Sequence, residues 1–506
     1  VGHLTMLALA GRRRMMRLTA VLVAASALEA RGFNLSNTLG DGVVLQRAPQ
    51  PAIVWGFGAV GSSVTASLDG VPLPAVSTGT DSIWRIQLPP MPARSEPSTI
   101  SFVSSDGGRA SLRDVLFGDV FLCSGQSNMQ YTPRSMAGMN NASAEIASAD
   151  AFSSTIKIFT VGMDTSCGAP GSGRADCSQP FTQLNPDVPA PTNPCPGSRS
   201  CRKPWAAATN ATVGGRAWDD FSAACFLFGR QMQQALGVPV GLISSNWGGT
   251  PLQAWAPVEA LRHCGGASEG GTLYNSMIAP FTVGPMSLSG AIWYQGESNV
   301  GHARSYSCLF PAMIQWWRAW FAAPFLWFGF VQIAGYAYSR PVPAAGGAFV
   351  PDTARSRAAG DLRQAQLSAL ALPNVAVATT VDTGDYYNIH PPDKQTPALR
   401  LASQALHMIH GLRPSEPVPM YAGSRLVDTA RGGTVCVRVD VRAGGQRVKL
   451  TRIAPEAATQ SSTLGRTPSV PRNRCVTDVF GHDAGKAGAF PEDCGYPAIG
   501  GTDGAG

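Results

Sequence analysis

Short apolar runs that end in polar turns recur through the middle of the chain. They occupy residues 120–123 (VFLC), 240–245 (VGLISS) and 291–295 (AIWYQ), and Gly, Ser, Asn or Gln stands at the end of each. Runs of this length are typical of strands buried on both faces of a parallel sheet. Apolar residues at helical spacing over 217–236 predict a helix between the first two runs. Alternating strands and helices predict an α/β domain over residues 115–412.

The segments on either side of this domain have a different pattern. Residues 33–114 hold short alternating stretches separated by Gly, Pro and Asp-Gly turns, which predicts an N-terminal all-β module. Residues 413–506 begin as a β-like segment and continue into a Gly- and Pro-rich tail that we expect to be disordered. Inside the α/β domain, residues 164–203 form an insert rich in Pro, Gly, Ser and Cys, which cannot build a core of its own.

Residues 1–27 have the features of a signal peptide. Four arginines at positions 12–17 precede an apolar run too short to span a membrane, and Ala25-Ser26-Ala27 follows as a cleavage signal. Removal of this segment lowers the formal net charge from +7 to +3, which is not the charge of a nucleic-acid-binding protein. Glycosylation sequons begin at Asn34, Asn141 and Asn210. We therefore expect a secreted or lumenal protein with no membrane span and no nucleic-acid partner.

The eleven cysteines fit the same compartment. No Cys-x-x-Cys pair occurs and no histidine cluster has the spacing of a metal site, so neither a metal nor another cofactor is expected. Disulfides are the predicted link within the insert. Its four cysteines allow three pairings, and the sequence does not choose among Cys167, Cys177, Cys195 and Cys201.

The turn after the first buried run carries the strongest chemical signal. Gly125-Gln126-Ser127-Asn128 places a hydroxyl just beyond the carboxyl end of a strand, where open α/β sheets bind ligands. The backbone N–H of Ser127 is also free to meet an oxyanion there. A serine that only caps a helix is the alternative. The turn is not the nucleophile elbow of α/β-hydrolases, because Met129 stands where that motif requires glycine.

Two other strand ends carry matching polar turns. Trp247-Gly248-Gly249 follows the second run, and two glycines let the backbone approach a ligand closely and offer N–H donors. Gln295 and Glu297 end the third run, where the amide of Gln295 suits an oxyanion. Because carboxyl ends of parallel strands meet at one edge, these turns predict a single site.

Four separated blocks resemble one known family. They are FGDVFLCSGQSNMQ; FSAACFLFGR with GLISSNWGGTPLQAW; LYNSMIAP with GAIWYQGESN; and IHPPDKQ. In this order they are similar to the sialate O-acetylesterase family of SGNH-type serine esterases, and the resemblance runs from about Phe33 to about Leu426. It implies a three-layer SGNH-hydrolase (flavodoxin-like) fold with a parallel sheet.

The resemblance also implies a mechanism. Ser127 would attack an acetyl ester, and His390 in the IHP block would act as its base through an acetyl-enzyme. Many SGNH esterases place Asp three residues before the histidine, but Tyr387 stands there. The group that orients His390 is therefore left open between Asp385 and a backbone carbonyl such as that of Asn388, ahead of Glu297; Asp393 lies past the histidine. The expected oxyanion donors are Ser127, Gly248, Gly249 and Gln295, and the expected substrate contacts are Asn128, Trp247, Glu297 and Arg363, the last in a helix opening at Asp361.

Three functions fit these features. The first is hydrolysis of O-acetyl esters on sugars, above all O-acetylated sialic acids, free or linked to glycans. The second is the same chemistry on acetylated xylan or pectin. The third is a non-catalytic carbohydrate-binding protein, with Trp55, Phe57 and Trp84 as a conceivable sugar platform, although core packing fits these aromatics better. Such a lectin has no need of Ser127 or His390, and the chain retains both.

Overall fold

The computed structural model describes residues 32–136, 142–163, 177–184, 202–218, 220–266, 271–336, 338, 353–385 and 387–412. It also describes the backbone of six outlying strands: β15 (Val342–Pro343), β16 (Phe349–Val350), β18 (Met420–Ala430), β19 (Thr434–Arg442), β20 (Val448–Arg452) and β21 (Pro497–Gly501). The expected signal peptide, most of the insert and most of the tail lie outside these residues. Within the described ranges, no helix has the length and hydropathy needed to span a membrane.

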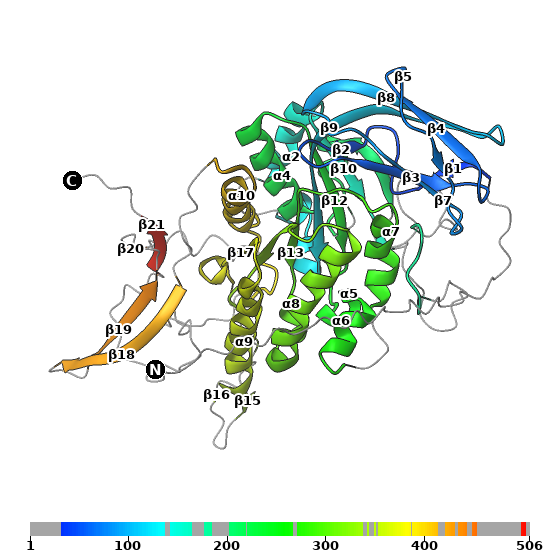
Figure 1. Ribbon diagram of the computed structural model, residues 1–506. Coiled ribbons are helices and arrows are strands. Elements are labelled where there is room, and N and C mark those ends of the chain that lie inside the picture. Colours follow the sequence, from blue (N-terminus) through cyan, green and yellow to red (C-terminus); the bar gives the residue numbers. More distant parts are fainter. Residues whose placement is uncertain are drawn as a thin grey trace, which may run out of the picture.

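A mixed sheet forms the centre of the protein (Figure 1). Its central strands run in the order β11-β10-β12-β9-β13-β14-β17. All neighbours from β10 to β17 are parallel, and β11 joins the edge antiparallel. The three apolar runs lie in β9, β12 and β13, so their prediction as buried parallel strands is confirmed. The bounds are β9 (Arg109–Gly125), β10 (Ile156–Thr160), β11 (Lys203–Ala207), β12 (Val240–Asn246), β13 (Gly290–Tyr294), β14 (Trp327–Val331) and β17 (Val375–Ala378).

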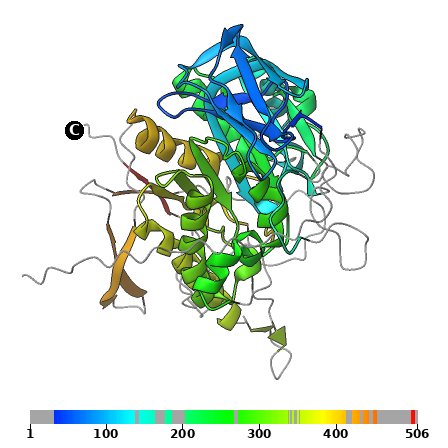
Figure 2. The same cartoon turned by 45° about the vertical axis from the view of Figure 1, so that its right-hand side comes forward.

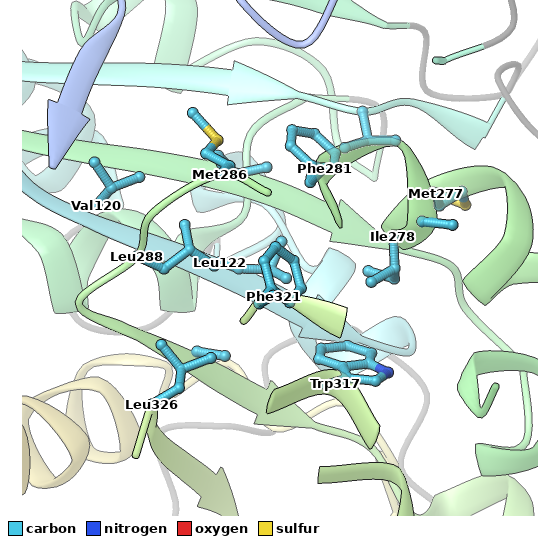
Figure 3. Close-up of a cluster of buried hydrophobic side chains, with 14 of the residues drawn as sticks. Val120, Leu122, Met277, Ile278, Phe281, Met286, Leu288, Trp317, Phe321 and Leu326 are labelled. Carbon is cyan, nitrogen blue, oxygen red and sulfur yellow. The ribbon is translucent and has the colours of Figure 1, made fainter. Parts of the chain in front are cut away.

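Helices cover both faces of this sheet because its strands are apolar on both sides. On one face α4 (Ala223–Leu236) packs against Phe121 and Cys123 of β9, and α10 (Gln395–His410) packs beside it against β14 and β17. On the other face, Leu122 of β9 packs with α8 (Ala303–Trp320), as Figure 3 shows for Leu122 beside Trp317 and Phe321. The remaining helices on that face are α5 (Leu252–Trp255), α6 (Val258–His263), α7 (Ala279–Thr282) and α9 (Thr353–Gln366).

The N-terminal strands gather at one end of the molecule (blue in Figures 1 and 2). Strand β9 belongs to both regions, since its first part pairs with β8 and its last part with β12 and β13. The expected boundary between residues 114 and 115 falls inside this strand, at a bulge where Asp114 has φ 53°. The other strands here are β1 (Asn34–Leu35), β2 (Val44–Gln46), β3 (Ile53–Phe57), β4 (Ser63–Leu68), β5 (Val71–Pro72), β6 (Val76–Ser77), β7 (Ile83–Gln87) and β8 (Arg94–Ser104).

The aromatic residues of this region are core residues. Trp55 and Trp84 are fully buried and Phe57 is 3% exposed. They therefore form no sugar platform.

Two helix starts differ from the sequence prediction. Helix α4 begins at Ala223 rather than at residue 217. Ser222 caps it by accepting a hydrogen bond from the Cys225 N–H. Trp218, before this cap, has a left-handed φ of 70° and therefore cannot belong to the helix. Helix α9 begins at Thr353 rather than Asp361. Alanine and arginine, both good helix formers, are frequent in this first part of the helix and extend it toward the N-terminus.

Two disulfides join elements of the core. Cys123 on β9 is bonded to Cys225 on α4, and Cys264 after α6 is bonded to Cys308 on α8. Of the four insert cysteines, Cys177 is disulfide-bonded, and the other three lie outside the described residues.

Candidate active site

Three strand ends lie level at one edge of the sheet. Gly125, the last residue of β9, is in register with Asn246 of β12 on one side and Tyr294 of β13 on the other. Gly125 has φ 143°, and a Cβ at this position would lie 2.2 Å from the Tyr294 carbonyl oxygen. Only glycine fits this close approach, so the chain can turn sharply and place Ser127 at the edge of the sheet. The three polar turns therefore meet, as the sequence predicts.

Ser127 is the first residue of the short helix α1 (Ser127–Gln130) and is half-buried. The N-cap of this helix is Gln126, and no side chain caps it. Within the described part of the chain, no hydrogen bond involves Ser127 Oγ or its backbone N–H. The alternative of a capping serine therefore has no support. A Cβ on Gly248 would lie 3.1 Å from that of Ser127, so the glycine turn after β12 packs directly against the nucleophile candidate.

Side chains on both sides of Ser127 hold the surrounding loops. Gln126 Oε1 accepts hydrogen bonds from the N–H groups of Gly296 and Ser298, at 3.3 and 3.2 Å. Gln130 Oε1 accepts from the Gly248 N–H at 2.7 Å, and its amide donates to the Trp218 carbonyl at 2.9 Å. The residues next to the serine therefore fix the loops after β12 and β13.

Two of the four expected oxyanion donors are already engaged. The Gly248 N–H is bonded to Gln130. Gln295 Nε2 donates to the Thr250 carbonyl at 3.2 Å and to Asn299 Oδ1 at 2.7 Å, so its amide supports the glycine turn instead of facing the site. The sequence prediction is wrong for these two groups. Gly249 is exposed, and no acceptor for its N–H is found among the described residues.

His390 lies in the loop between β17 and α10. Its ring is half-buried between Trp218, 4.8 Å away edge to face, and Tyr131, 6.3 Å away, both measured between ring centroids. Burial and the nearby charge of Lys394 lower the pKa of His390 from 6.5 to about 4. No hydrogen bond between the described residues joins the imidazole to Ser127, an arrangement common in active sites without substrate.

The carboxylates considered as orienting groups have other partners. Asp385 Oδ1 accepts a hydrogen bond from the Tyr387 N–H at 2.8 Å, which holds the loop before His390. Asp393 caps α10 by accepting from the Thr396 N–H and hydroxyl, at 3.0 and 2.7 Å. Glu297, in the short 3-10 turn Glu297–Asn299, accepts from Asn128 Nδ2 at 2.5 Å. The Asn388 side chain accepts from the His390 N–H at 2.9 Å.

The expected substrate contacts mostly face inward. Asn128 is fully buried. Arg363 donates to the carbonyls of Ile333 and Ala334, both at 2.9 Å, and burial lowers its pKa. Burial raises the pKa of Glu297, and its Oε2 has no hydrogen-bond partner in the part of the chain that the structure describes. Trp247 is partly exposed and donates its backbone N–H to the Gly125 carbonyl.

Sequence reasoning missed two residues of the site. Trp218 packs against His390 and has a left-handed backbone, a strained conformation for a bulky residue. Lys394 is fully buried and donates to Asn128 Oδ1 at 2.7 Å. The only sequence signal for Lys394 is its position four residues after His390 in the last block.

Comparison with known proteins gives a consistent result. A family model described as carbohydrate esterase, sialic acid-specific acetylesterase, matches residues 199–405. Sialate O-acetylesterases of Pongo abelii and Homo sapiens are each 30% identical over 423 residues, covering 75% of this chain and 72% of theirs. The crystal structure of a carbohydrate acetylesterase from Xanthomonas citri is similar with a TM-score of 0.64 and 28% identity, covering 84% of this chain and 85% of that one.

Fold, site and relatives together define a carboxylic-ester hydrolase with an α/β fold. The family model covers the last three blocks, and the alignment with the relatives extends over 75% of the chain. The chain belongs to the sialate O-acetylesterase family.

Proposed function

We propose that this esterase removes acetyl groups from O-acetylated sialic acids through a Ser–His mechanism. The observation that carries the proposal is the position of Ser127 at the edge where three strand ends meet, with no hydrogen-bond partner for its Oγ or N–H among the described residues. The names of the relatives at 30% identity support the substrate class.

The chemistry divides into two steps. Ser127 Oγ attacks the acetyl carbonyl while His390 takes the hydroxyl proton, and His390 then returns that proton to the departing sugar oxygen. Water hydrolyses the acetyl-enzyme with His390 again as base. The oxyanion of each tetrahedral intermediate is held by the N–H groups of Ser127 and Gly249, which have no other acceptor among the described residues.

His390 works without a carboxylate partner in this proposal. Contact with Trp218 and Tyr131 fixes its ring plane, and a loop carbonyl such as that of Asn388 orients it. Burial lowers the pKa of the ring, whereas a paired carboxylate would raise it.

We further propose an SGNH-type three-layer fold and a secreted or lumenal location. The helices on both faces of the parallel strands support the fold. The two core disulfides and the exposure of Asn34 and Asn210, both in glycosylation sequons, support the location.

Acetylated xylan or pectin is the second candidate substrate, favoured by the similarity to a carbohydrate acetylesterase from Xanthomonas citri. The test measures acetate release from O-acetylated sialic acid and from acetylated xylan in parallel. Faster release from sialic acid supports the first candidate, and the reverse order supports the second. Ser127→Ala should reduce either activity by several orders of magnitude. Ser305→Ala, an exposed serine on α8, is the matched control. Unchanged turnover by a folded Ser127→Ala enzyme would rule out Ser127 as the nucleophile.

A further inference from the structure

A lysine is completely buried beside the proposed catalytic pair. Lys394 is the N-cap residue of α10, and none of its surface is exposed. Burying an ammonium group is costly unless it is paired and hydrogen-bonded. The contacts of Lys394 must therefore compensate the cost of removing its ammonium group from water.

The contacts of Lys394 connect the two proposed catalytic loops. Its Nζ donates to Asn128 Oδ1 at 2.7 Å and to the Pro391 carbonyl at 2.5 Å. Asn128 follows Ser127 directly, and Pro391 follows His390 directly. The ammonium group therefore joins the neighbour of the proposed nucleophile to the neighbour of the proposed base, and Lys394 itself lies 266 residues after Asn128.

Asn128 completes this connection. Its Nδ2 donates to the Ile389 carbonyl at 3.0 Å and to Glu297 Oε1 at 2.5 Å, while its Oδ1 accepts from Lys394. An amide can accept and donate at once, whereas a carboxylate or an alkyl group cannot fill both roles. The result is a buried hydrogen-bond chain from the ammonium group of Lys394 through the amide of Asn128 to the carboxyl group of Glu297.

The rings around Lys394 add to its stabilisation. Its Nζ lies 4.6 Å from the ring centroid of Tyr131 and 5.4 Å from that of Tyr294, both in the range of cation–π attraction. Tyr131 also stacks against His390. The ring of Tyr131 therefore contacts both the lysine and the imidazole.

We propose that Lys394 is a positioning residue of the esterase, which fixes the loop of His390 against the turn of Ser127 through Asn128. This inference rests on the proposed Ser–His mechanism. A displacement of about 1 Å between reacting groups can cost roughly 10²-fold in rate, so a rigid link between these loops has a direct kinetic effect.

The charge of Lys394 has a second effect, on the protonation of His390. It lowers the pKa of the imidazole, in addition to burial, and so favours the neutral form that can accept a proton. The charged groups facing Lys394 are Glu297 from the turn after β13, Asp393 from its own loop and His390 itself. Burial lowers the pKa of Lys394 to about 7, while Glu297 and Asp393 act in the opposite direction. Below that pH the lysine is charged and its effect on His390 is complete.

Two substitutions separate position from charge. Lys394→Met removes both the charge and the hydrogen bonds, and Lys394→Gln keeps a donor without charge. Lys157→Met is the control, because Lys157 is a partly buried lysine on β10 whose ammonium group donates to the Ser153 carbonyl, away from His390 in the sequence and in the sheet. Two properties are measured: kcat/KM on nitrophenyl acetate, and the pH dependence of His390 modification by diethyl pyrocarbonate, followed by peptide mass mapping. The second readout does not depend on activity.

Lys394→Met should lose about 10²-fold in kcat with little change in KM. Its modification midpoint should rise by about one pH unit, because the repelling charge is gone. Lys394→Gln should recover much of kcat but retain the raised midpoint, and Lys157→Met should match wild type in both. Wild-type kcat and midpoint in folded Lys394→Met would overturn the proposal. If Lys394→Met does not fold, the test uses Lys394→Gln alone. In that case a wild-type modification midpoint together with a wild-type kcat would overturn the proposal. The two proposals can fail separately. If wild-type activity does not depend on Ser127, the proposed function is refuted. If the modification midpoint of His390 still shifts in the Lys394 variants, the coupling of Lys394 to His390 stands.

Discussion

The side-chain carbonyl of Gln130 accepts a hydrogen bond of 2.7 Å from the backbone N–H of Gly248, 118 residues further along the chain. Gln130 ends the helix that begins with Ser127, and Gly248 packs against Ser127. The bond sets how far the glycine turn stands from the nucleophile. The N–H of the next residue, Gly249, is therefore the oxyanion donor that we propose for this turn.

Gln130→Leu tests this role. The variant leaves the Gly248 N–H without its acceptor and should lose about 1–3 kcal/mol of stability, the usual cost of an unpaired buried group. kcat/KM should fall at the same time, because the turn carrying Gly249 is no longer fixed. Urea unfolding and acetyl-ester kinetics measure the two effects. Gln234→Leu, at an exposed position of α4, should change neither.

The pH dependence of activity should reflect the lowered pKa of His390. The base must be neutral to accept a proton, and its pKa is lowered from 6.5 to about 4. kcat/KM should therefore rise with pH through about 4 and level off well below 6.5. The unfolded chain binds more protons than the folded one between these values, so stability should also rise with pH across this window. An acidic limb centred near 6.5 would contradict the burial of the ring. His390→Ala should be inactive at every pH, and His263→Ala is the control.

Asp385→Asn should have a small effect. Asparagine can still accept the hydrogen bond from the Tyr387 N–H, so the loop keeps its shape. Loss of a triad aspartate costs about 10⁴ in turnover. We expect a loss below about tenfold and an unmoved acidic limb, measured on nitrophenyl acetate. A loss approaching that of a triad aspartate would instead assign Asp385 as the orienting group.

The two disulfides should differ in their contributions to stability. The Cys123–Cys225 bond spans 102 residues and the Cys264–Cys308 bond spans 44. The chain-entropy model gives about 4.7 and about 4.0 kcal/mol for loops of these lengths. Paired Cys→Ala variants compared by guanidinium unfolding should therefore show the larger loss for the first bond. Equal stability of both variants and wild type under oxidising conditions would mean that the bonds do not restrain the unfolded chain.

The sequence predicts the part of the fold that depends on local pattern. The apolar runs give the buried strands β9, β12 and β13, and the glycines at their ends give the meeting of the turns around Ser127. Helix α10 ends at His410, directly before Gly411, which has the left-handed φ of 64° common after helices.

The partners of polar side chains could not be predicted in the same way. The amide of Gln295 looks available in the sequence, but its partners Thr250 and Asn299 are set by the packing of two loops. Lysine is almost never fully buried, so sequence reasoning leaves Lys394 on the surface. Its burial depends on neighbours far away in the chain, Asn128, Tyr131 and Tyr294, which no local pattern identifies.

Strand β9 has a consequence for how this protein can be divided. One uninterrupted strand, residues 109–125, pairs with the N-terminal strands at its start and ends two residues before Ser127. A chain beginning at residue 115 would lack β2 and β8, which pair with the first part of the strand that leads to Ser127, and the buried Val115, Leu116 and Phe117 would lose these neighbours. The two regions therefore depend on each other structurally, because a cut at this point would leave the strand that leads to Ser127 without part of its sheet.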